Sequence, residues 1–289
     1  MRTIAIVGAG VIGLSWARLA REHGWDVVIT DPRPDLENVV AEFADDEHVR
    51  ATSDLAEAVA DADLVQENGP ERLDVKKSLF AEIVQAAKPD AVLATSSSSI
   101  SATLIATELE DPARVVVGHP FNPPELMPLV EVLPGERTAP EAVDRAVELY
   151  EALGRVPVVI RKELPGFVAN RLQMALSREA RYLVEQGVVS AEQLDTILQN
   201  SLGLRWATTG LFEGNVLGGG PGGIRHLFAG VGAETGKIEF GVPSTDPEVV
   251  ENLFEQVEDT YGVGPEAYER LRDKRDHRTR AVLKALRAP

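Results

Sequence analysis

The chain has 289 residues, of which 44% are hydrophobic and 26% charged, a composition typical of a folded globular protein large enough for two domains. Its net charge of −17 argues against nucleic acid as a partner, because binding to phosphates depends on clustered Lys and Arg. The lack of cysteine excludes disulfides and thiolate metal sites, and no apolar run approaches the ~20 residues that cross a membrane, so we expect a cytoplasmic protein with no metal and no membrane partner.

The first half of the chain alternates short β-branched runs with amphipathic or Ala-rich segments, which is typical of parallel βαβ units. The first run follows Met1 and Arg2 directly, so we expect a buried strand there and no export signal. The predicted strands are Thr3–Val7, Asp26–Thr30, Val49–Thr52, Leu64–Glu67, Ala91–Thr95, Val115–Gly118 and Val156–Ile160. This order predicts an α/β domain over residues 1–162, a doubly wound, mainly parallel sheet of the Rossmann type.

After residue 162 the pattern becomes helical. Apolar residues recur at helical spacing from Phe167 to Gln186, and a residue able to cap a helix precedes both Ala191–Leu198 and Pro247–Tyr261. The Gly-rich run 218–223 predicts a mobile or tightly turning loop, and the charged run Pro265–Pro289 predicts a solvated helix. Residues 163–289 are therefore expected to form an all-helical second domain.

A GxGxxG motif occupies residues 8–13, between the first predicted strand and the helix that follows it. The motif alone is weak and also fits a tight turn without a ligand. In this position, however, its glycines let backbone N–H groups approach a pyrophosphate at the positive end of a helix. The expected cofactor contacts in the motif are Gly8, Gly10, Val11, Ile12 and Gly13.

Asp31 lies eighteen residues past Gly13, just after the second predicted strand. A carboxylate there can accept both ribose hydroxyls and would repel a 2′-phosphate, so the sequence favours NAD over NADP. Arg33 is the cation that could instead accept that phosphate, although Pro32 and Pro34 restrict its approach.

His119 and Glu131 stand twelve residues apart, downstream of the dinucleotide motif. Oxidation of a secondary alcohol needs a base for the hydroxyl proton, and imidazole titrates near working pH. A carboxylate on the other ring nitrogen fixes the tautomer and stabilises the imidazolium. Each residue alone fits a structural role, the histidine at a strand end and the glutamate in a salt bridge. Together they predict proton transfer beside a nicotinamide.

Several strings in the chain resemble the 3-hydroxyacyl-CoA dehydrogenase superfamily, in its branch of lambda-crystallin, L-gulonate 3-dehydrogenase and L-carnitine dehydrogenase. The strings are GAGVIGLSWA, QENGPERLDVKK, ATSSSSI, GHPFNPPELMPLVEVLPG and LPGFVANRLQMALSREARYLVEQGVVS. A later string, GLRWATTGLFEGNVLGGGPGGIRHL, is most similar to the carnitine dehydrogenase pattern. The resemblance covers about residues 2 to 230 and is specific for the family but not for the substrate.

The resemblance implies a role for each residue that matches the family's active site. His119 would be the base and Glu131 its partner, while Ser98 would hydrogen-bond the substrate oxygen, with its register within residues 96–99 open by one. Asn170 would orient the substrate carbonyl from the start of the second domain, which would make the active site an interdomain cleft. A cap or a helix contact is the alternative role for this asparagine.

The same resemblance places a second segment near the nicotinamide. It implies cofactor contacts for Glu67, Asn68 and Lys76, with Glu71 in the same segment and Asn68 the best candidate for direct contact. Lys76 could instead support the substrate or the local charge. The resemblance also implies a homodimer formed through the helical domain.

The region after the second predicted strand bears on the substrate. In the acyl-CoA enzymes of the family it carries a long helical insertion with basic residues, whereas here only 32 residues separate Asp31 from Leu64. These include ten acidic residues against the two cations Arg33 and Arg50, a field that should repel the phosphates of CoA. A small free hydroxy acid therefore fits better, and a cationic one would be attracted.

Three residues of the second domain are candidates for holding such a substrate. Arg205 could grip its carboxylate with two hydrogen bonds, because a guanidinium matches a carboxylate in shape. Trp206 and Phe212 could offer aromatic faces to a quaternary ammonium, although helix packing is the alternative for both.

The predicted reaction is a reversible, NAD-dependent oxidation of a small 3-hydroxy acid, carnitine-like or gulonate-like, to the 3-keto acid. One alternative is a short-chain L-3-hydroxyacyl-CoA dehydrogenase, which keeps the chemistry and changes the carrier. Another is a catalytically silent NAD-binding protein of the crystallin kind, against which the joint presence of His119, Glu131, Ser98 and Asn170 argues.

Overall fold

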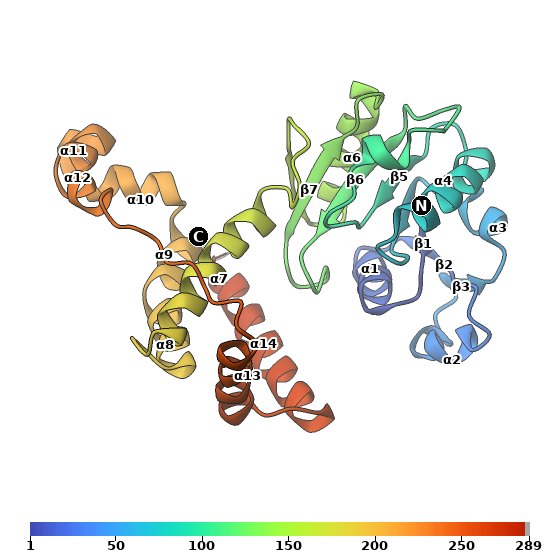
Figure 1. The fold of residues 1–289 in the computed structure, drawn as a ribbon. Coiled ribbons are helices and arrows are strands. Elements are labelled where there is room, and N and C mark those ends of the chain that lie inside the picture. Colours follow the sequence, from blue (N-terminus) through green and yellow to red (C-terminus); the bar gives the residue numbers. More distant parts are fainter. Residues whose placement is uncertain (287–289) are drawn as a thin grey trace. The chain divides into compact units, whose positions relative to one another are not determined.

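The computed structural model describes residues 1–286 of the chain. The chain divides into two compact units, the first comprising residues 1–171 and the second beginning at Leu172 (Figure 1). The first unit thus extends past residue 162, where the sequence pattern changes, into the first residues of helix α7 (Ala169–Glu185). Among the described residues, no helix combines the length and apolar character that crossing a membrane requires.

The first unit is built on an eight-stranded sheet with the strand order β3-β2-β1-β4-β5-β6-β7-β8. All neighbouring strands are parallel except β6 and β7, which confirms the predicted mainly parallel, doubly wound fold. The strands are β1 (Thr3–Val7), β2 (Asp26–Thr30), β3 (Val49–Thr52), β4 (Leu64–Glu67), β5 (Val92–Thr95), β6 (Val115–Pro120), β7 (Leu129–Pro134) and β8 (Val156–Val159). The sequence pattern does not predict β7, because Pro128 directly before it and Pro134 as its last residue resemble the punctuation of a loop.

Helices cover both faces of this sheet, and successive side chains of each strand point to opposite faces. Ile4 and Ile6 of β1 join one buried cluster, whereas Ala5 and Val7 of the same strand join another. In the first cluster Trp16 and Tyr150 bring their ring centroids within 5.7 Å. The helices of this unit are α1 (Val11–Glu22), α2 (Leu36–Val39), α3 (Leu55–Val59), α4 (Leu73–Ala86), α5 (Ala102–Ile105) and α6 (Pro140–Ala152), with a 3-10 turn η1 (Ala41–Phe43).

The second unit is helical, as predicted. After α7 it contains α8 (Ala191–Asn200), α9 (Leu202–Thr208), α10 (Leu211–Gly218), η2 (Gly220–Gly222), α11 (Gly223–Ala229), α12 (Val231–Thr235), α13 (Pro247–Tyr261) and α14 (Pro265–Leu286). The Ser190 side chain accepts a hydrogen bond from Gln193 N at 3.2 Å and caps α8, and Asp246 caps α13 through Glu248 N at 2.9 Å.

The structure also describes the two remaining predicted segments of the second unit, the Gly-rich run and the charged C-terminal run. The Gly-rich run 218–223 is a tight connection that contains η2, with positive φ at Gly220 and Gly223. The charged C-terminal helix is described from Pro265 to Leu286, and residues 287–289 of its predicted range lie outside the described residues. From α9 to α14, no described helical residue is buried.

Candidate active site

The turn between β1 and α1 has the shape that a bound pyrophosphate requires. Gly8 has a φ of +104°, and a Cβ on Gly13 would overlap the Gly8 carbonyl oxygen, so both positions need glycine. A Cβ on Gly10, which caps α1, would meet nothing within 4 Å, and Val11 is 66% exposed. The N–H groups at the start of α1, including those of Val11 and Ile12, therefore border open space, which suits an anion.

Asp31 supports this turn from the loop after β2. Its Oδ2 accepts a hydrogen bond from Ala9 N at 2.8 Å, and its Oδ1 accepts one from Arg33 N at 3.0 Å. The guanidinium of Arg33 donates to both carboxylate oxygens of Asp35, at 2.7 and 3.1 Å. The cation that could have bound a 2′-phosphate is thus paired within its own loop, and the carboxylate that favours NAD lies beside the glycine turn.

His119 and Glu131 are direct partners across the antiparallel pair β6 and β7. His119 Nδ1 lies 2.9 Å from Glu131 Oε2, and the two residues are 6% and 1% exposed. The imidazole also lies against two aromatic rings, with centroid distances of 5.4 Å to Phe121 and 5.5 Å to Phe167. The structure therefore brings together the two residues that the sequence proposes as base and partner, in a buried setting beside two aromatic rings.

The second oxygen of Glu131 binds the backbone at the start of α7. Oε1 accepts hydrogen bonds from Val168 N and Ala169 N, both at 3.0 Å. Burial raises the pKa of Glu131, but the hydrogen bonds from His119, Ala169 and Val168 outweigh it, and the net pKa is lowered. Asn170 follows directly in the first turn of α7, so the structure places this predicted substrate residue close to the His119 and Glu131 pair.

Phe167 directs these two N–H groups toward Glu131. It has a φ of +50°, which is unusual for a bulky residue, and it follows Gly166 with a φ of +77°. The side chain is 1% exposed, so burial in the core of the first unit holds the residue in this conformation.

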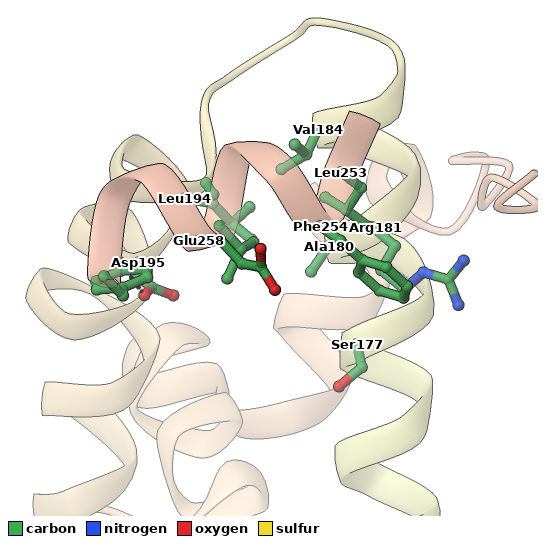
Figure 2. A pocket seen from close by; sticks show the side chains of 12 residues that line it. Ser177, Ala180, Arg181, Val184, Leu194, Asp195, Leu253, Phe254 and Glu258 are labelled. Atoms are coloured by element: carbon green, nitrogen blue, oxygen red, sulfur yellow. Dashed lines mark hydrogen bonds between the residues drawn. The ribbon is translucent and has the colours of Figure 1, made fainter. Parts of the chain in front are cut away.

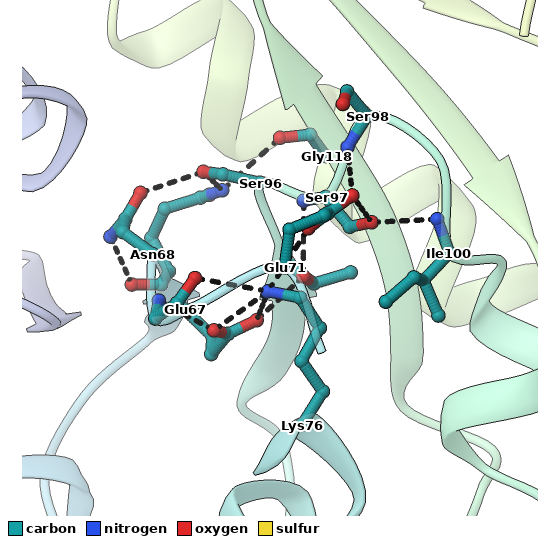
Figure 3. Close-up of polar contacts among 12 residues, drawn as sticks. Glu67, Asn68, Glu71, Lys76, Ser96, Ser97, Ser98, Ile100 and Gly118 are labelled. Carbon is teal, nitrogen blue, oxygen red and sulfur yellow. Dashed lines mark hydrogen bonds and ion pairs between the residues drawn. The ribbon is translucent and has the colours of Figure 1, made fainter. Parts of the chain in front are cut away.

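The serine run after β5 is organised by Glu71 (Figure 3). A single oxygen, Glu71 Oε1, accepts hydrogen bonds from Ser97 Oγ at 2.6 Å, Ser98 N at 3.1 Å, Ser99 N at 3.0 Å and Ser99 Oγ at 2.8 Å. Burial raises the pKa of Glu71. The hydrogen bonds from the serines and the charge of Lys76 lower it by more than burial raises it, so the net pKa lies below the usual value. Within residues 1–286 the Ser98 hydroxyl has no hydrogen-bond partner, which leaves it available to a substrate oxygen.

Glu67 and Lys76 form a buried ion pair instead of an exposed contact surface. Lys76 Nζ lies 2.8 and 2.9 Å from the two carboxylate oxygens of Glu67, and the residues are 1% and 0% exposed. Thr95 Oγ1 and Gly69 N also donate to Glu67, each at 2.6 Å. This pair would have to open before either side chain could contact the cofactor directly. It supports the segment on which Asn68, which is only partly buried, is presented.

Arg205 and Trp206 lie on α9 and Phe212 lies on α10, all in the second unit. All three are exposed, with Trp206 at 43% and Phe212 at 71%. They belong to a different unit from His119, and their contact with the substrate stays a prediction.

The second unit also contains an apolar groove of its own, between α7, α8 and α13 (Figure 2). Its apolar lining includes Val184, Leu194, Leu253 and Phe254, with the charged groups of Arg181, Asp195 and Glu258 around it. None of the predicted site residues lines this groove.

Sequence reasoning missed four residues around the site: Phe121, Phe167, Gln66 and Tyr150. Gln66 carries a readable signal, because an amide inside the apolar run of a buried strand needs internal partners. Phe121, Phe167 and Tyr150 carry none, since an apolar or aromatic residue in such segments is ordinary core.

Comparison with known proteins identifies the family to which this chain is related. The model of the 3-hydroxyacyl-CoA dehydrogenase NAD binding domain matches residues 44–164, and that of the C-terminal domain matches residues 166–269. The model of the alanine dehydrogenase/PNT C-terminal domain matches residues 2–68, which include the glycine turn.

Relatives extend over most of the chain. An L-carnitine dehydrogenase of Pseudomonas sp is 39% identical over 99% of this chain and 94% of its own length. A 3-hydroxyacyl-CoA dehydrogenase of Gibberella moniliformis is 43% identical over 77% of this chain and 74% of its own. The crystal structure of FHMPC 5-dehydrogenase, an NAD+ dependent dismutase, superimposes with a TM-score of 0.81 at 30% identity, over 99% of this chain and 98% of that one. The chain therefore belongs to the 3-hydroxyacyl-CoA dehydrogenase family and is an NAD-dependent dehydrogenase that acts on a CH–OH group.

Proposed function

We propose that this chain oxidises a small 3-hydroxy acid, carnitine-like or gulonate-like, to the corresponding 3-keto acid, with His119 as general base. The observation that carries the proposal is the buried contact of 2.9 Å between His119 Nδ1 and Glu131 Oε2. Bound NAD supplies the hydride acceptor, and the residues of the first unit supply the proton chemistry.

The hydrogen-bond partners define the role of each ring nitrogen of His119. Because the Glu131 carboxylate can only accept, Nδ1 carries the proton, and Nε2 of the neutral ring is left to accept the hydroxyl proton of the substrate. The carboxylate then stabilises the imidazolium at close range. Ser98 would donate to the substrate oxygen, and the amide of Asn170, which lies in the first unit, would orient the substrate.

The region between β2 and β4 supports a small substrate over a CoA thioester. It holds only the four-residue α2, η1, β3 and the five-residue α3, with no long basic helix. Its two cations are already paired, Arg33 with Asp35 and Arg50 with Glu57, each at 2.7 Å. Unpaired acidic charge remains in excess and would repel the phosphates of CoA. Arg205 would bind the substrate carboxylate, and Trp206 with Phe212 a quaternary ammonium.

Relatives favour the carnitine-like branch of this proposal. Proteins named L-carnitine dehydrogenase match 99% or more of this chain at 38 to 40% identity. The name of the Gibberella relative keeps a short-chain L-3-hydroxyacyl-CoA dehydrogenase as the second candidate. A silent, crystallin-like protein is disfavoured, because a purely structural protein has no need to combine a buried His119–Glu131 pair with a Ser98 hydroxyl that has no partner among the described residues.

A substrate panel tests the proposal. L-carnitine, L-gulonate, 3-hydroxybutyrate and 3-hydroxybutyryl-CoA are each incubated with NAD, and formation of reduced nicotinamide is followed by absorbance. We expect kcat/KM to be highest for one of the free acids. A clear preference for the thioester would support the second candidate, and inactivity on all four substrates despite NAD binding would contradict the proposal.

We further propose that the chain is a cytoplasmic homodimer formed through its helical unit. The apolar side chains of this unit are unusually exposed, with Phe212 at 71%, Phe228 at 58% and Phe240 at 77%, and the groove of Figure 2 adds to this surface. A second copy would cover it. Sedimentation equilibrium should give twice the chain mass, and a monomer at micromolar concentration would contradict the dimer. The cytoplasmic location rests on the lack of cysteine.

A further inference from the structure

Gln66 is a fully buried amide in the middle of the sheet, with both amide hydrogens donated and its oxygen accepting one hydrogen bond. On β4, its Nε2 donates to Ser96 Oγ at 2.8 Å and to Gly118 O at 3.1 Å, while its Oε1 accepts from Tyr150 Oη at 2.7 Å. The Gly118 carbonyl oxygen can only accept, so the nitrogen of the amide must face it and the side chain has one orientation. Figure 3 labels Ser96 and Gly118, the two acceptors of this amide.

One arm of this network leads to the nucleotide turn. Ser96 Oγ accepts from Gln66 Nε2 and from Trp16 Nε1 at 3.3 Å, and it donates its own proton to Asn68 Oδ1 at 2.7 Å. Asn68 Nδ2 donates to the backbone oxygen of Gln66 at 2.7 Å. The amide of Asn68 is therefore fixed at both ends, and its second Nδ2 hydrogen has no partner within residues 1–286.

Asn68 lies directly beside the glycine turn. Its backbone N–H donates to Val7 O at 2.6 Å, and a Cβ on Gly8 would come within 2.9 Å of the Asn68 carbonyl carbon. Because Asn68 is only partly buried, its remaining amide hydrogen can reach a molecule bound at this turn. The network thus orients the Asn68 side chain so that Nδ2 offers its second hydrogen as a donor, because Oδ1 already accepts a hydrogen bond from Ser96.

The other arm leads to the catalytic strand. Gly118 immediately precedes His119 on β6, and a Cβ on Gly118 would overlap the Tyr150 hydroxyl, so glycine is needed for this close approach. Burial raises the pKa of Tyr150, and the hydroxyl therefore stays protonated and donates to Gln66 throughout the working pH range. Tyr150 comes from α6, so its contacts tie that helix to β4 and β6, the two strands that flank β5.

We propose that Gln66 is a positioning residue for both partners of the reaction: through Ser96 it holds the Asn68 amide as a donor to the bound dinucleotide, and through Gly118 it holds the strand that carries His119. The first arm depends only on NAD binding. The second arm rests on the proposed function, with His119 as base.

Two variants separate the arms, and a third is the control. Ser96→Ala breaks the link to Asn68, whereas Gln66→Met removes both links at nearly constant volume. Thr138→Val is the control, because Thr138 Oγ1 donates at 2.6 Å to Val115 O at the opposite end of the same strand β6. The dissociation constant for NAD alone is measured by titration calorimetry, kcat is measured at saturating NAD, and thermal unfolding identifies a temperature at which every variant is folded.

We expect Ser96→Ala and Gln66→Met each to raise the NAD dissociation constant about three- to tenfold, the usual effect of one neutral hydrogen bond. Gln66→Met should in addition lower kcat about tenfold, and Thr138→Val should change neither quantity. Unaltered NAD affinity in folded Ser96→Ala would overturn the first arm, even if Gln66→Met does not fold. An unaltered kcat in folded Gln66→Met would overturn the second. NAD titration needs no substrate, so an error in the proposed hydroxy acid leaves the first result intact.

Discussion

His119 and Glu131 pair across the antiparallel step of an otherwise parallel sheet, and that reversal is what lets residues only twelve apart in sequence meet. In a parallel neighbour of β6, a residue at this sequence distance would still lie in the connection between the strands. Because β7 runs the other way, its first half returns to the edge at which β6 ends. Glu131 is thereby opposite His119 and can hold the ring with one oxygen.

Replacement of His119 by alanine tests its role as base. We expect the NAD dissociation constant to stay near the wild-type value and kcat to fall at least ~100-fold, the usual loss when a general base is removed. His48→Ala is a matched control, because His48 also pairs with a carboxylate, Asp26, at 2.8 Å, but at the start of β2. Equal turnover in His119→Ala and His48→Ala would remove His119 from the mechanism.

Glu131 should make stability depend on pH at the acid end. Its folded-state pKa is lowered, so the unfolded chain binds more protons in the window between the folded pKa and the unfolded value of about 4.3. The stabilisation is therefore complete above that value and is lost as the pH falls through the folded pKa. Urea unfolding of the wild type and Glu131→Gln from pH 7 to pH 3 should show a stability difference that shrinks below about pH 4. A difference that stays constant over this range would show that the carboxylate charge is not what stabilises the pair.

Glu71 should control the order of the serine loop, since one of its oxygens holds four donors. We expect Glu71→Ala to cost about 1–3 kcal/mol of stability and to lower kcat/KM at least tenfold. Hydrogen exchange at the Ser98 and Ser99 amides should accelerate. Glu57→Ala, which removes an exposed carboxylate bound to Thr52 and Arg50, should leave kcat/KM unchanged. Slow exchange at both serines in Glu71→Ala would show that the loop is held by other contacts.

The glycine turn offers two contrasting substitutions. Gly13→Ala should destabilise the fold, because the new methyl group would overlap the Gly8 carbonyl oxygen. Gly10→Ala should leave the melting temperature nearly unchanged, because its Cβ would enter open space at an ordinary φ of −81°. That space is where we expect the pyrophosphate, so the NAD affinity of Gly10→Ala should fall at least tenfold in calorimetry. Wild-type affinity in this variant would place the cofactor elsewhere.

Local features of the site are readable from the sequence, because strand, turn and helix follow one another there. The glycine turn at residues 8–13 and Asp31 after β2 depend only on such neighbours, and the structure places them together. The pairing of His119 with Glu131 depends on the direction of β7, which prolines around it conceal. The chemistry of the two residues and the resemblance to a family suggested that pairing, and periodicity did not.

Other parts of the site depend on contacts between distant segments and leave no local signature. Tyr150 reaches Gln66 across 84 residues of sequence, and both look like ordinary members of a helix and a strand. Phe167 has a left-handed backbone that only its burial explains, and nothing in its sequence context demands it. The serine run attracts attention as a possible substrate site, yet its shape comes from Glu71, 26 residues away from Ser97.

The attachment of Glu131 to Val168 N and Ala169 N has a consequence for motion. The chain crosses into the second unit at Leu172, three residues beyond Ala169. A displacement of Val168 and Ala169 would withdraw two donors from Glu131 and raise the pKa of its carboxyl, because these hydrogen bonds lower it. The protonation of Glu131, and with it the contact to His119, is therefore tied to the backbone at the start of α7.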